Sequence, residues 1–299
     1  ESTEGLGRLA AARQAYDPAW PGYLRDDVAP EEMRPTIGLW FGAEDLATLR
    51  RKAASPLYAK VMANLRGTAA RFLAIEPERS IADVARYLYP FTRDRLWYVD
   101  GMPEYYVGAA ACGLVGLIDR DPAALRMAAR IALSQAFCGS WDAWLDTVPE
   151  TVWEDRGFPN FIIGVGCALA LDWAGCCLTD RGREVMVKAL ADKALPRIQQ
   201  SLMKHDYMWY SNQGAWDVYG LVVCSAAIAS RWPHGDMFLD RSMEILNGIV
   251  GRYIADDGGA FEGMEYQLHT MAFAMLAALA YGGLRGRAFV EVASPKLGK

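Results

Sequence analysis

Residues 207–231, YMWYSNQGAWDVYGLVVCSAAIASR, carry the pattern that decides the fold of this chain. The first part of the stretch is polar and aromatic, and the second part is a run of apolar and small residues. Such a change predicts a loop that leads directly into a buried helix. Asn212, Trp216 and Tyr219 recur at spacings of four and three, so they lie on one face of that helix.

Two roles fit the polar residues at this helix mouth. Ser and Asn are common N-caps, so Ser211 or Asn212 is expected to close the first turn. The other role is ligand binding, because the carboxamides of Asn212 and Gln213 stand beside indole and phenol rings. Amides hydrogen-bond a carboxylate without cancelling its charge, and aromatic faces pack on sugar rings, which together suit a sugar acid. Taken alone, the stretch favours the cap.

Size and charge exclude some classes of protein. A chain of 299 residues fits one large domain or two smaller ones and can bury a substantial core. Its net charge is −5 and no long run of residues carries one sign, so we expect no nucleic-acid partner. Hydrophobic residues make up 53% of the chain, but Gly, Asp, Arg or Trp interrupt each apolar stretch before it reaches membrane-spanning length. We therefore expect no membrane partner.

The six cysteines fit neither a metal site nor a disulfide framework. Most lie inside apolar segments, where a free thiol behaves as a small hydrophobic group, and no CxxC or Cys/His spacing occurs. We expect no metal and no cofactor. Free thiols favour a reducing compartment, so the predicted location is the cytoplasm. The alternative is the periplasm or secretion after removal of a signal peptide, since the chain opens with ESTEG and shows no leader.

Most of the remaining chain repeats one kind of segment, an apolar-periodic run of helical length that ends in a turn. Helices are predicted over residues 43–53, 81–89, 103–118, 122–137, 161–178, 182–203, 215–230, 236–255 and 266–281, and another begins at Pro56. The helix after Pro56 is expected to bury Leu57, Val61, Leu65 and Phe72, and the 236–255 helix Leu239, Met243, Leu246, Val250 and Tyr253. Pro196 is expected to kink the 182–203 helix.

These helices predict an all-α fold. Successive helices with short connections indicate stacked antiparallel helical hairpins, and helices that are apolar nearly all round belong to an inner layer. Two such layers make an incomplete α/α toroid, predicted over residues 36–285. Residues 1–35 are expected to hold a short helix, at 6–16, and a Pro-rich arm that wraps the surface. Residues 286–299 form a C-terminal tail with the one strand-like run, at 288–293.

A second polar stretch, DDGGAFEGMEYQLH at residues 256–269, leads into another apolar helix. Glu262, Tyr266 and His269 are four and three residues apart, so they share a face if the helix starts early. They would place proton-handling groups at one helix mouth. In the alternative interpretation, Asp-Asp-Gly-Gly is an ordinary turn and Tyr266 is a core residue.

Four segments, taken in order, resemble one family. They are LWFGAEDLATLRRKA, ALDWAGCCLTDRGREVMVKAL, YSNQGAWDVYGLVV and DGGAFEGMEYQLHTMAF. Their order and separation resemble those of the N-terminal helical domain of heparinase II/III-type and alginate polysaccharide lyases, over residues 39–281. The resemblance implies an α/α toroid and cleavage of a uronic-acid polysaccharide by β-elimination. An acidic polysaccharide or oligosaccharide is the substrate that it implies.

The resemblance also implies roles for single residues. In such lyases an Asn, usually followed by His, binds the uronate carboxylate, and Asn212 matches that position. Gln213 stands where many relatives carry His, and it can donate a hydrogen bond but cannot act as a base. Tyr266 matches the tyrosine that transfers the proton, and His269 is a further catalytic candidate. The substrate-binding candidates are Trp209, Tyr210, Trp216, Tyr219, Glu262, Arg93, Arg95 and Trp97.

The chemistry explains these residue types. Removal of a proton next to a carboxylate builds negative charge on the carboxyl group, so the amides of Asn212 and Gln213 would stabilise it. A tyrosine with a pKa of about 10 needs a nearby cation or hydrogen-bond donor to act as a base at neutral pH. The candidate cations are Arg93, Arg95, Arg156 and His205.

The extent of the chain differs from that of the family. Such lyases usually continue into a β-sandwich domain that contributes a further catalytic His, whereas this sequence stops at Lys299. The tail at 286–299 is then the start of that domain in a fragment that is inactive alone, or the chain is a short form with an open trough. The β-sandwich or a homo-oligomer would complete the site.

Two other functional classes stay open. A glycoside hydrolase with the same helical architecture would use paired carboxylates, either Asp217 with Glu262 or Asp142 with Glu154. A non-catalytic carbohydrate-binding domain would use tryptophans as sugar platforms, namely Trp97, Trp141, Trp144, Trp153, Trp209 and Trp216. Most large aromatic residues in a helical protein, however, serve only for packing.

Overall fold

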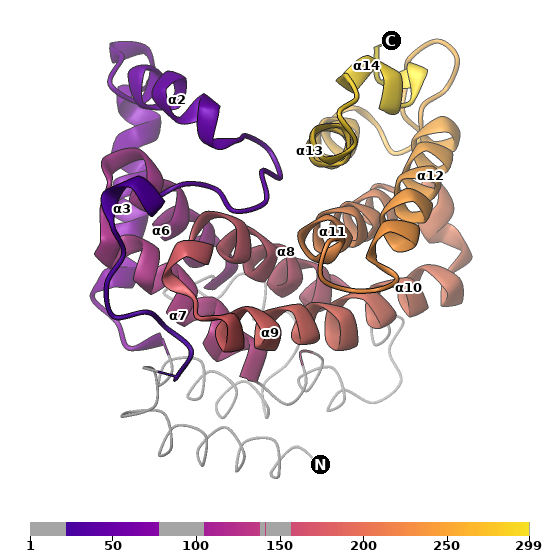
Figure 1. Cartoon of the computed structure of the whole chain (residues 1–299). Helices are drawn as coiled ribbons and strands as arrows, with labels where there is room; N and C mark the ends of the chain where they lie inside the picture. The colour runs from indigo at the N-terminus through magenta and orange to yellow at the C-terminus, as the bar shows by residue number, and fades with distance from the viewer. Residues whose placement is uncertain (1–21, 78–104, 138–140, 142–156, 299) are drawn as a thin grey trace. The chain divides into compact units, whose positions relative to one another are not determined.

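The computed structural model describes residues 22–77, 105–137, 141 and 157–298 (Figure 1). The regular elements in these ranges are helices, and strand-like pairing there is limited to two isolated antiparallel bridges. The predicted all-α class is therefore confirmed. The chain divides into two compact units: unit 1 is Glu1–Ile37, Phe41–Glu154 and Gly166–Ala189, and unit 2 is Gly38–Trp40, Asp155–Val165 and Leu190–Lys299.

Unit 1 is built on a helical hairpin. Its described helices are α2 (Leu46–Ala53), α3 (Ala59–Leu73), α6 (Tyr105–Asp119), α7 (Pro122–Phe137), the later part of α8 (Phe158–Trp173) and α9 (Asp180–Ala189). The turn between α6 and α7 places Arg120 at a φ of 55°, and the Asp121 carboxylate accepts the Ala123 amide at 2.9 Å. This cap starts α7, and α6 packs on both α7 and α3.

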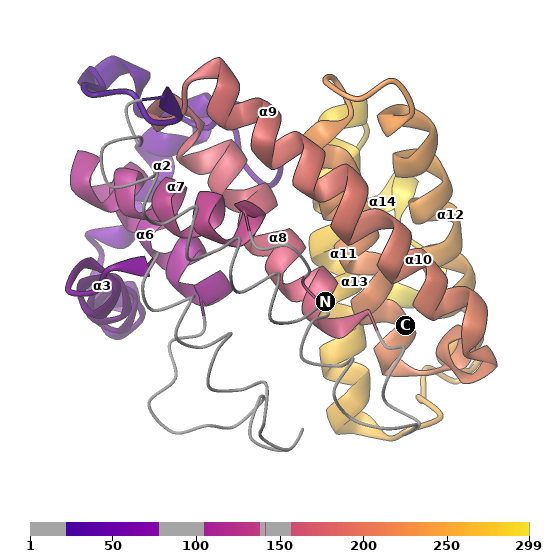
Figure 2. The ribbon, with the colours of Figure 1, turned by 90° about the horizontal axis from the view of Figure 1, so that it is seen from below.

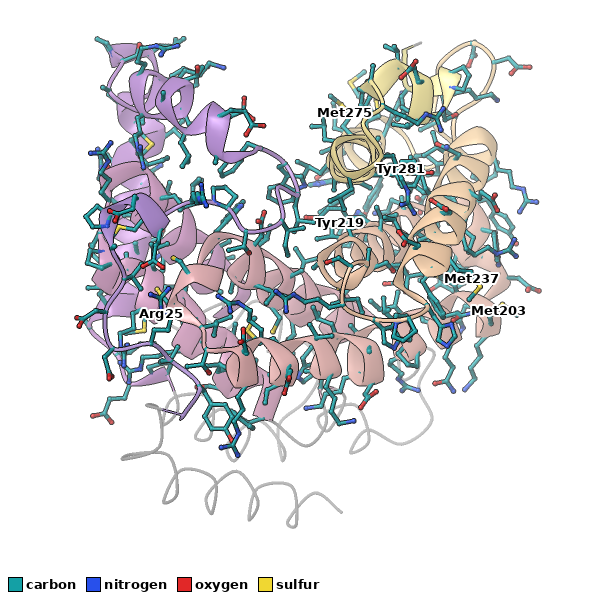
Figure 3. All side chains as sticks on the ribbon, viewed as in Figure 1. Arg25, Met203, Tyr219, Met237, Met275 and Tyr281 are labelled. Carbon is teal, nitrogen blue, oxygen red and sulfur yellow. The ribbon has the colours of Figure 1, made fainter. Side chains whose placement is uncertain are left out.

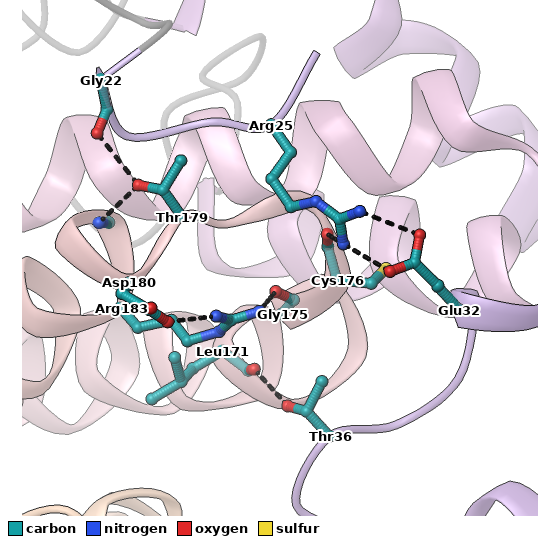
Figure 4. Close-up of polar contacts among 11 residues, drawn as sticks. Gly22, Arg25, Glu32, Thr36, Leu171, Gly175, Cys176, Thr179, Asp180 and Arg183 are labelled. Atoms are coloured by element: carbon teal, nitrogen blue, oxygen red, sulfur yellow. Dashed lines mark hydrogen bonds and ion pairs between the residues drawn. The ribbon is translucent and has the colours of Figure 1, made fainter. Parts of the chain in front are cut away.

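The segment that precedes α2 is attached to unit 1 by side-chain hydrogen bonds (Figure 4). The Arg25 guanidinium donates to both carboxylate oxygens of Glu32, at 2.7 and 3.0 Å, and to the Cys176 carbonyl at 3.1 Å. The Thr36 hydroxyl donates to the Leu171 carbonyl at 2.8 Å, and the Thr179 hydroxyl donates to the Gly22 carbonyl at 3.0 Å. Residues 22–36 therefore run along unit 1 with one 3₁₀ turn, Pro30–Glu32.

Unit 2 holds both polar stretches. Its helices are the start of α8, α10 (Leu195–Lys204), α11 (Asn212–Ile228), α12 (Gly235–Tyr253), α13 (Met264–Arg285) and α14 (Phe289–Val292). Helix α11 contacts α10, α12 and α13, and nearly all of its residues are buried (Figures 1 and 2). This burial explains why its sequence is apolar on every side after the first turn.

Polar contacts also join α12 to α13. The Arg285 guanidinium reaches Asp236 at 2.7 Å and Asp240 at 2.8 Å, and the Tyr281 hydroxyl donates to Asp240 at 3.0 Å. The stripe predicted for α12, Leu239 to Tyr253, is buried as expected. The two helices that carry the second polar stretch between them are thus fixed against each other.

Three details of the sequence analysis are wrong. Leu57 and Val61 are 79% and 60% exposed, whereas Phe72 is buried as predicted. Helix α3 also buries Met62 and Ala69, which the prediction does not include, because its inner face is turned by about one residue. Residues 288–293 contain the short helix α14 and not a strand, since this run is too short for alternation to decide. The 182–203 helix is interrupted by a π-helical segment, Leu190–Ala194, directly before the predicted kink at Pro196.

The five described cysteines are free and buried, as the sequence predicts. Burial raises the pKa of the Cys112 thiol to about 12, so this thiol stays protonated near neutral pH. The predicted helices at 6–16 and 81–89 and the loop at 90–101 lie outside the described residues.

Candidate functional site

The mouth of α11 is capped by Ser211. Its hydroxyl accepts the Gly214 amide at 3.5 Å, and its backbone is extended, with φ −125° and ψ 159°. Asn212 is the first residue of the helix and therefore has no capping role. The choice that the sequence left open between these two residues is thus decided by backbone conformation.

Asn212 is 3% exposed, and its carboxamide makes no hydrogen bond to a residue in the described ranges. The carboxamide atoms are not among the fully buried polar atoms that lack a partner there, so they keep some access to solvent. A carboxamide that is accessible at a helix mouth and makes no such hydrogen bond is a candidate ligand-binding group. The neighbouring Gln213 differs, because its side-chain oxygen accepts the Tyr207 hydroxyl at 2.9 Å, and only its NH₂ group is open to a ligand.

The loop before α13 is bound to the mouth of α11. The Glu262 Oε2 atom accepts the Asn212 backbone N–H at 2.7 Å. A carboxylate is favourable there because the first amides of a helix are unpaired and carry partial positive charge. Gly258 and Gly263, with φ of 87° and 93°, allow the sharp turns that the loop needs. The two helix mouths that the sequence pairs are therefore adjacent in unit 2.

Glu262 does not lie on the helix as the sequence analysis expects. Helix α13 begins at Met264, after the positive-φ residue Gly263, so Glu262 belongs to the turn and only Tyr266 and His269 belong to the helix. The spacing argument fails because Gly263 interrupts the helical backbone.

Aromatic rings continue the contact between α11 and α13. The Trp216 ring meets His269 edge-on, with centroids 6.0 Å apart, and lies 5.4 Å from the ring of Phe273. Phe273 also packs 5.0 Å from the ring of Tyr219, which Figure 3 marks on α11. Of these rings, that of Tyr219 is buried, so it supports the site instead of offering a sugar platform.

Tyr266 is 48% exposed, and its hydroxyl makes no hydrogen bond to a described residue. His269 is also exposed, one turn further along α13. Tyr253, at the end of α12, and Thr270, on α13, are buried in the core. The sequence analysis treats Tyr253 as a core residue, as the structure has it, and does not single out Thr270.

Some of the other candidate binding residues and cations are described by the structure, and the rest lie outside the described residues. The Arg252 guanidinium, which the sequence analysis misses, lies 5.8 Å from the Trp209 ring centroid. Tyr210 is half exposed at the end of the 3₁₀ turn Asp206–Tyr210, and His205 packs beside Tyr207 at 5.9 Å. Arg93, Arg95, Trp97 and Arg156 lie outside the described residues, as do Asp142, Glu154, Trp144 and Trp153.

Within the described ranges, no group of three or more His, Cys, Asp or Glu side chains has the arrangement of a metal site, and no helix is long and apolar enough to cross a membrane. No protein-family model matches the chain, and no curated protein sequence matches it either. The functional assignment consequently depends on the residues of the site.

Proposed function

We propose that this chain is the helical domain of a polysaccharide lyase of the heparinase II/III or alginate type, and that its hairpins form an incomplete α/α toroid. The substrate class is an acidic, uronic-acid-containing polysaccharide or oligosaccharide. The observation that carries the proposal is the carboxamide of Asn212, which makes no hydrogen bond to a described residue and lies at a helix mouth bound to the turn before the helix that bears Tyr266 and His269. A β-sandwich domain or a second copy of the chain is the partner expected to complete the site.

The proposed reaction is an elimination. The Tyr266 phenolate removes the proton from the carbon next to the uronate carboxylate, and the negative charge spreads onto that carboxylate. The amide NH₂ groups of Asn212 and Gln213 donate hydrogen bonds to it as the charge develops. The bond to the glycosidic oxygen then breaks, the double bond forms, and the Tyr266 phenol returns its proton to the leaving oxygen.

Glu262 restricts how the substrate binds. Its carboxylate already accepts the Asn212 backbone amide, and so occupies the position where an anion would meet the mouth of α11. A substrate carboxylate is therefore expected at the side-chain amides, at a distance from Glu262 that limits repulsion between like charges. The positive charge that would offset Glu262 is expected from Arg252 or from the undescribed arginines.

The burial of Asp217 weighs against the hydrolase alternative. Asp217 is fully buried, whereas Glu262 is exposed, so this pair does not present two carboxylates to one glycosidic bond.

The reaction products distinguish a lyase from a hydrolase. A lyase forms an unsaturated uronate that absorbs in the ultraviolet, and a hydrolase forms no such product. An absorbance assay against a panel of uronate polymers tests the proposal, and binding without either product would indicate a carbohydrate-binding domain.

Asn212→Ala should slow elimination strongly. Loss of one transition-state donor raises the barrier by about 2 to 4 kcal/mol, which corresponds to a fall in kcat/KM of about 30- to 1000-fold. The rate of ultraviolet absorbance increase measures this. Asn64→Ala, at an exposed position on α3, is the matched control and should leave the rate unchanged. A lower melting temperature with an unchanged rate would contradict the role of Asn212.

A further inference from the structure

An arginine at the end of α12 carries a positive charge that is not paired with a described carboxylate. The side chain of Arg252 is exposed, and its guanidinium carbon lies 5.8 Å from the centroid of the Trp209 ring. Within the described ranges its guanidinium makes no ion pair. Other arginines of unit 2 differ, because Arg241 pairs with Glu244 at 3.7 Å and Arg285 pairs with two aspartates of α12. The N–H groups of Arg252 are therefore available to a ligand.

The Trp209 side of this contact is connected directly to the mouth of α11. Trp209 belongs to the 3₁₀ turn Asp206–Tyr210 and stands three residues before Asn212, so their Cα atoms are at most about 11 Å apart. This turn packs against both α11 and α12. Its Met208 carbonyl oxygen approaches Gly214, in the first turn of α11, so closely that a Cβ atom there would overlap it. The backbone that carries Trp209 is thus held against the mouth of α11.

The Arg252 side is connected to the same place through the second polar stretch. The carbonyl oxygen of the next residue, Tyr253, accepts the Phe261 N–H at 3.4 Å. Phe261 is followed by Glu262, whose carboxylate accepts the Asn212 N–H at 2.7 Å. Two short series of contacts, one through the 3₁₀ turn and one through Glu262, therefore join Arg252 to Asn212. Arg252 lies beside the proposed site, within unit 2.

The acidic residues that follow Arg252 in the chain have other contacts. Asp256 pairs with the Lys296 amine at 3.1 Å, and the Asp257 carboxylate accepts the Gly259 N–H at 2.9 Å. An anionic ligand at Arg252 would therefore replace water and would not have to displace a described carboxylate. The negative charges of the loop remain, however, and they limit the gain in binding free energy that one exposed arginine can give.

Contact with an indole suits a guanidinium that binds an anion. The face of the guanidinium rests on the ring, and its in-plane N–H groups stay available to two oxygens of one carboxylate or sulfate. We propose that Arg252, held by Trp209, forms a second anion-binding subsite, which takes the carboxylate or sulfate of a sugar unit next to the one bound at Asn212. This subsite depends on the proposed function, which supplies the polymer. Its role is binding, and no bond is made or broken there.

Arg252→Gln should weaken binding of a uronate oligosaccharide. Its Kd, measured by titration calorimetry, and the KM of elimination, measured by ultraviolet absorbance, should both rise about five- to tenfold, because one charged hydrogen-bonding group is lost at an exposed position. Binding by the parent should weaken as the salt concentration rises, and this dependence should be smaller in the variant. Arg241→Gln, at an exposed position on the same helix, is the matched control and should keep the parent's constants.

A double-mutant cycle tests the contribution of the indole. Trp209→Leu should raise the same Kd about threefold, because the guanidinium loses the surface that holds it. The double variant should bind no more weakly than Arg252→Gln alone, since Trp209 acts through Arg252. Fully additive losses would contradict the proposed subsite, because Trp209 would then bind the polymer independently.

Three polymers identify the anionic group. The probes are a polyuronate without sulfate, a sulfated polyuronate and a neutral glucan. An equal loss of affinity for both anionic polymers in Arg252→Gln would assign the subsite to the carboxylate, and a larger loss for the sulfated polymer would assign it to the sulfate. A similar loss for the neutral glucan would overturn the subsite, because charge would then have no part in it.

The two proposals fail in different ways. If the parent cleaves uronate polymers and Arg252→Gln keeps the parent's KM, Kd and salt dependence, the subsite is wrong and the lyase assignment stands. If the parent binds a uronate polymer through Arg252 but forms no unsaturated product, the lyase assignment fails and the subsite stands. A parent that binds none of the anionic polymers would refute both proposals.

Discussion

Tyr266→Phe should abolish elimination while binding of the polysaccharide is retained. The change removes the one oxygen that is proposed to take and return the proton, and a general base and acid contributes on the order of 10²- to 10⁴-fold to the rate. The Tyr266 hydroxyl makes no hydrogen bond to a described residue and the side chain is half exposed, so the fold should lose little stability. The rate is measured by ultraviolet absorbance of the product, and binding by titration calorimetry with a uronate oligosaccharide.

Tyr58→Phe is the matched control for this variant. Tyr58 is 38% exposed, lies at the end of the 3₁₀ turn Pro56–Tyr58, and has no proposed part in substrate binding or proton transfer. It should keep the rate of the parent within a few-fold. Equal rates for Tyr266→Phe and the parent, with an active parent, would refute the assignment of Tyr266.

Gly214→Ala should cause the largest loss of stability. A Cβ atom at this position would overlap the backbone carbonyl oxygen of Met208 and would stand 3.3 Å from the Cδ1 atom of Ile249. A backbone atom cannot move aside as a flexible side chain can, so the 3₁₀ turn and the start of α11 must separate. We expect a loss of about 3 to 5 kcal/mol in the free energy of unfolding, measured by urea denaturation. The Ser211 cap would be displaced as well, since Gly214 supplies its donor.

Gly248→Ala on α12 is the opposite case. A Cβ atom there meets nothing within 4 Å, and the residue lies inside a helix. Replacing a helical Gly by Ala in open space should raise the free energy of unfolding by about 0.5 to 1 kcal/mol. A similar gain in the free energy of unfolding for both variants would show that helix propensity decides the effect, and the close approach of Met208 would then be irrelevant.

The sequence predicts the helices well where periodicity is strong. The α7 boundaries and the buried stripe of α12 agree with the prediction, because large apolar residues at regular helical spacing indicate a single buried helix face. The buried face of α3 is predicted wrongly, since Leu57 and Val61 are apolar but exposed, while a small residue, Ala69, is buried. Size and hydrophobicity alone do not reveal which of two overlapping faces the rest of the core covers.

The sequence predicts that the two candidate segments belong together, and it does not predict the details of their contact. The pairing of Asn212 with the stretch that contains Glu262 and Tyr266 is found from sequence order, and the structure brings these segments together. The role of Ser211 as the cap and the position of Glu262 in a turn depend on backbone angles and on neighbours from other helices. Backbone angles and contacts between distant helices cannot be inferred from the residues of one segment alone.

The hydrogen bond between Glu262 and Asn212 also has a consequence for the order in which the site folds. The two residues are 50 positions apart, so this contact closes a long loop that includes all of α12. Closing such a loop costs chain entropy before it gives any contact, and a bond of this kind forms after the local helices. We therefore expect the mouth of α11 to mature late in folding, and a growing chain to acquire binding competence only when the segment beyond Glu262 has left the ribosome.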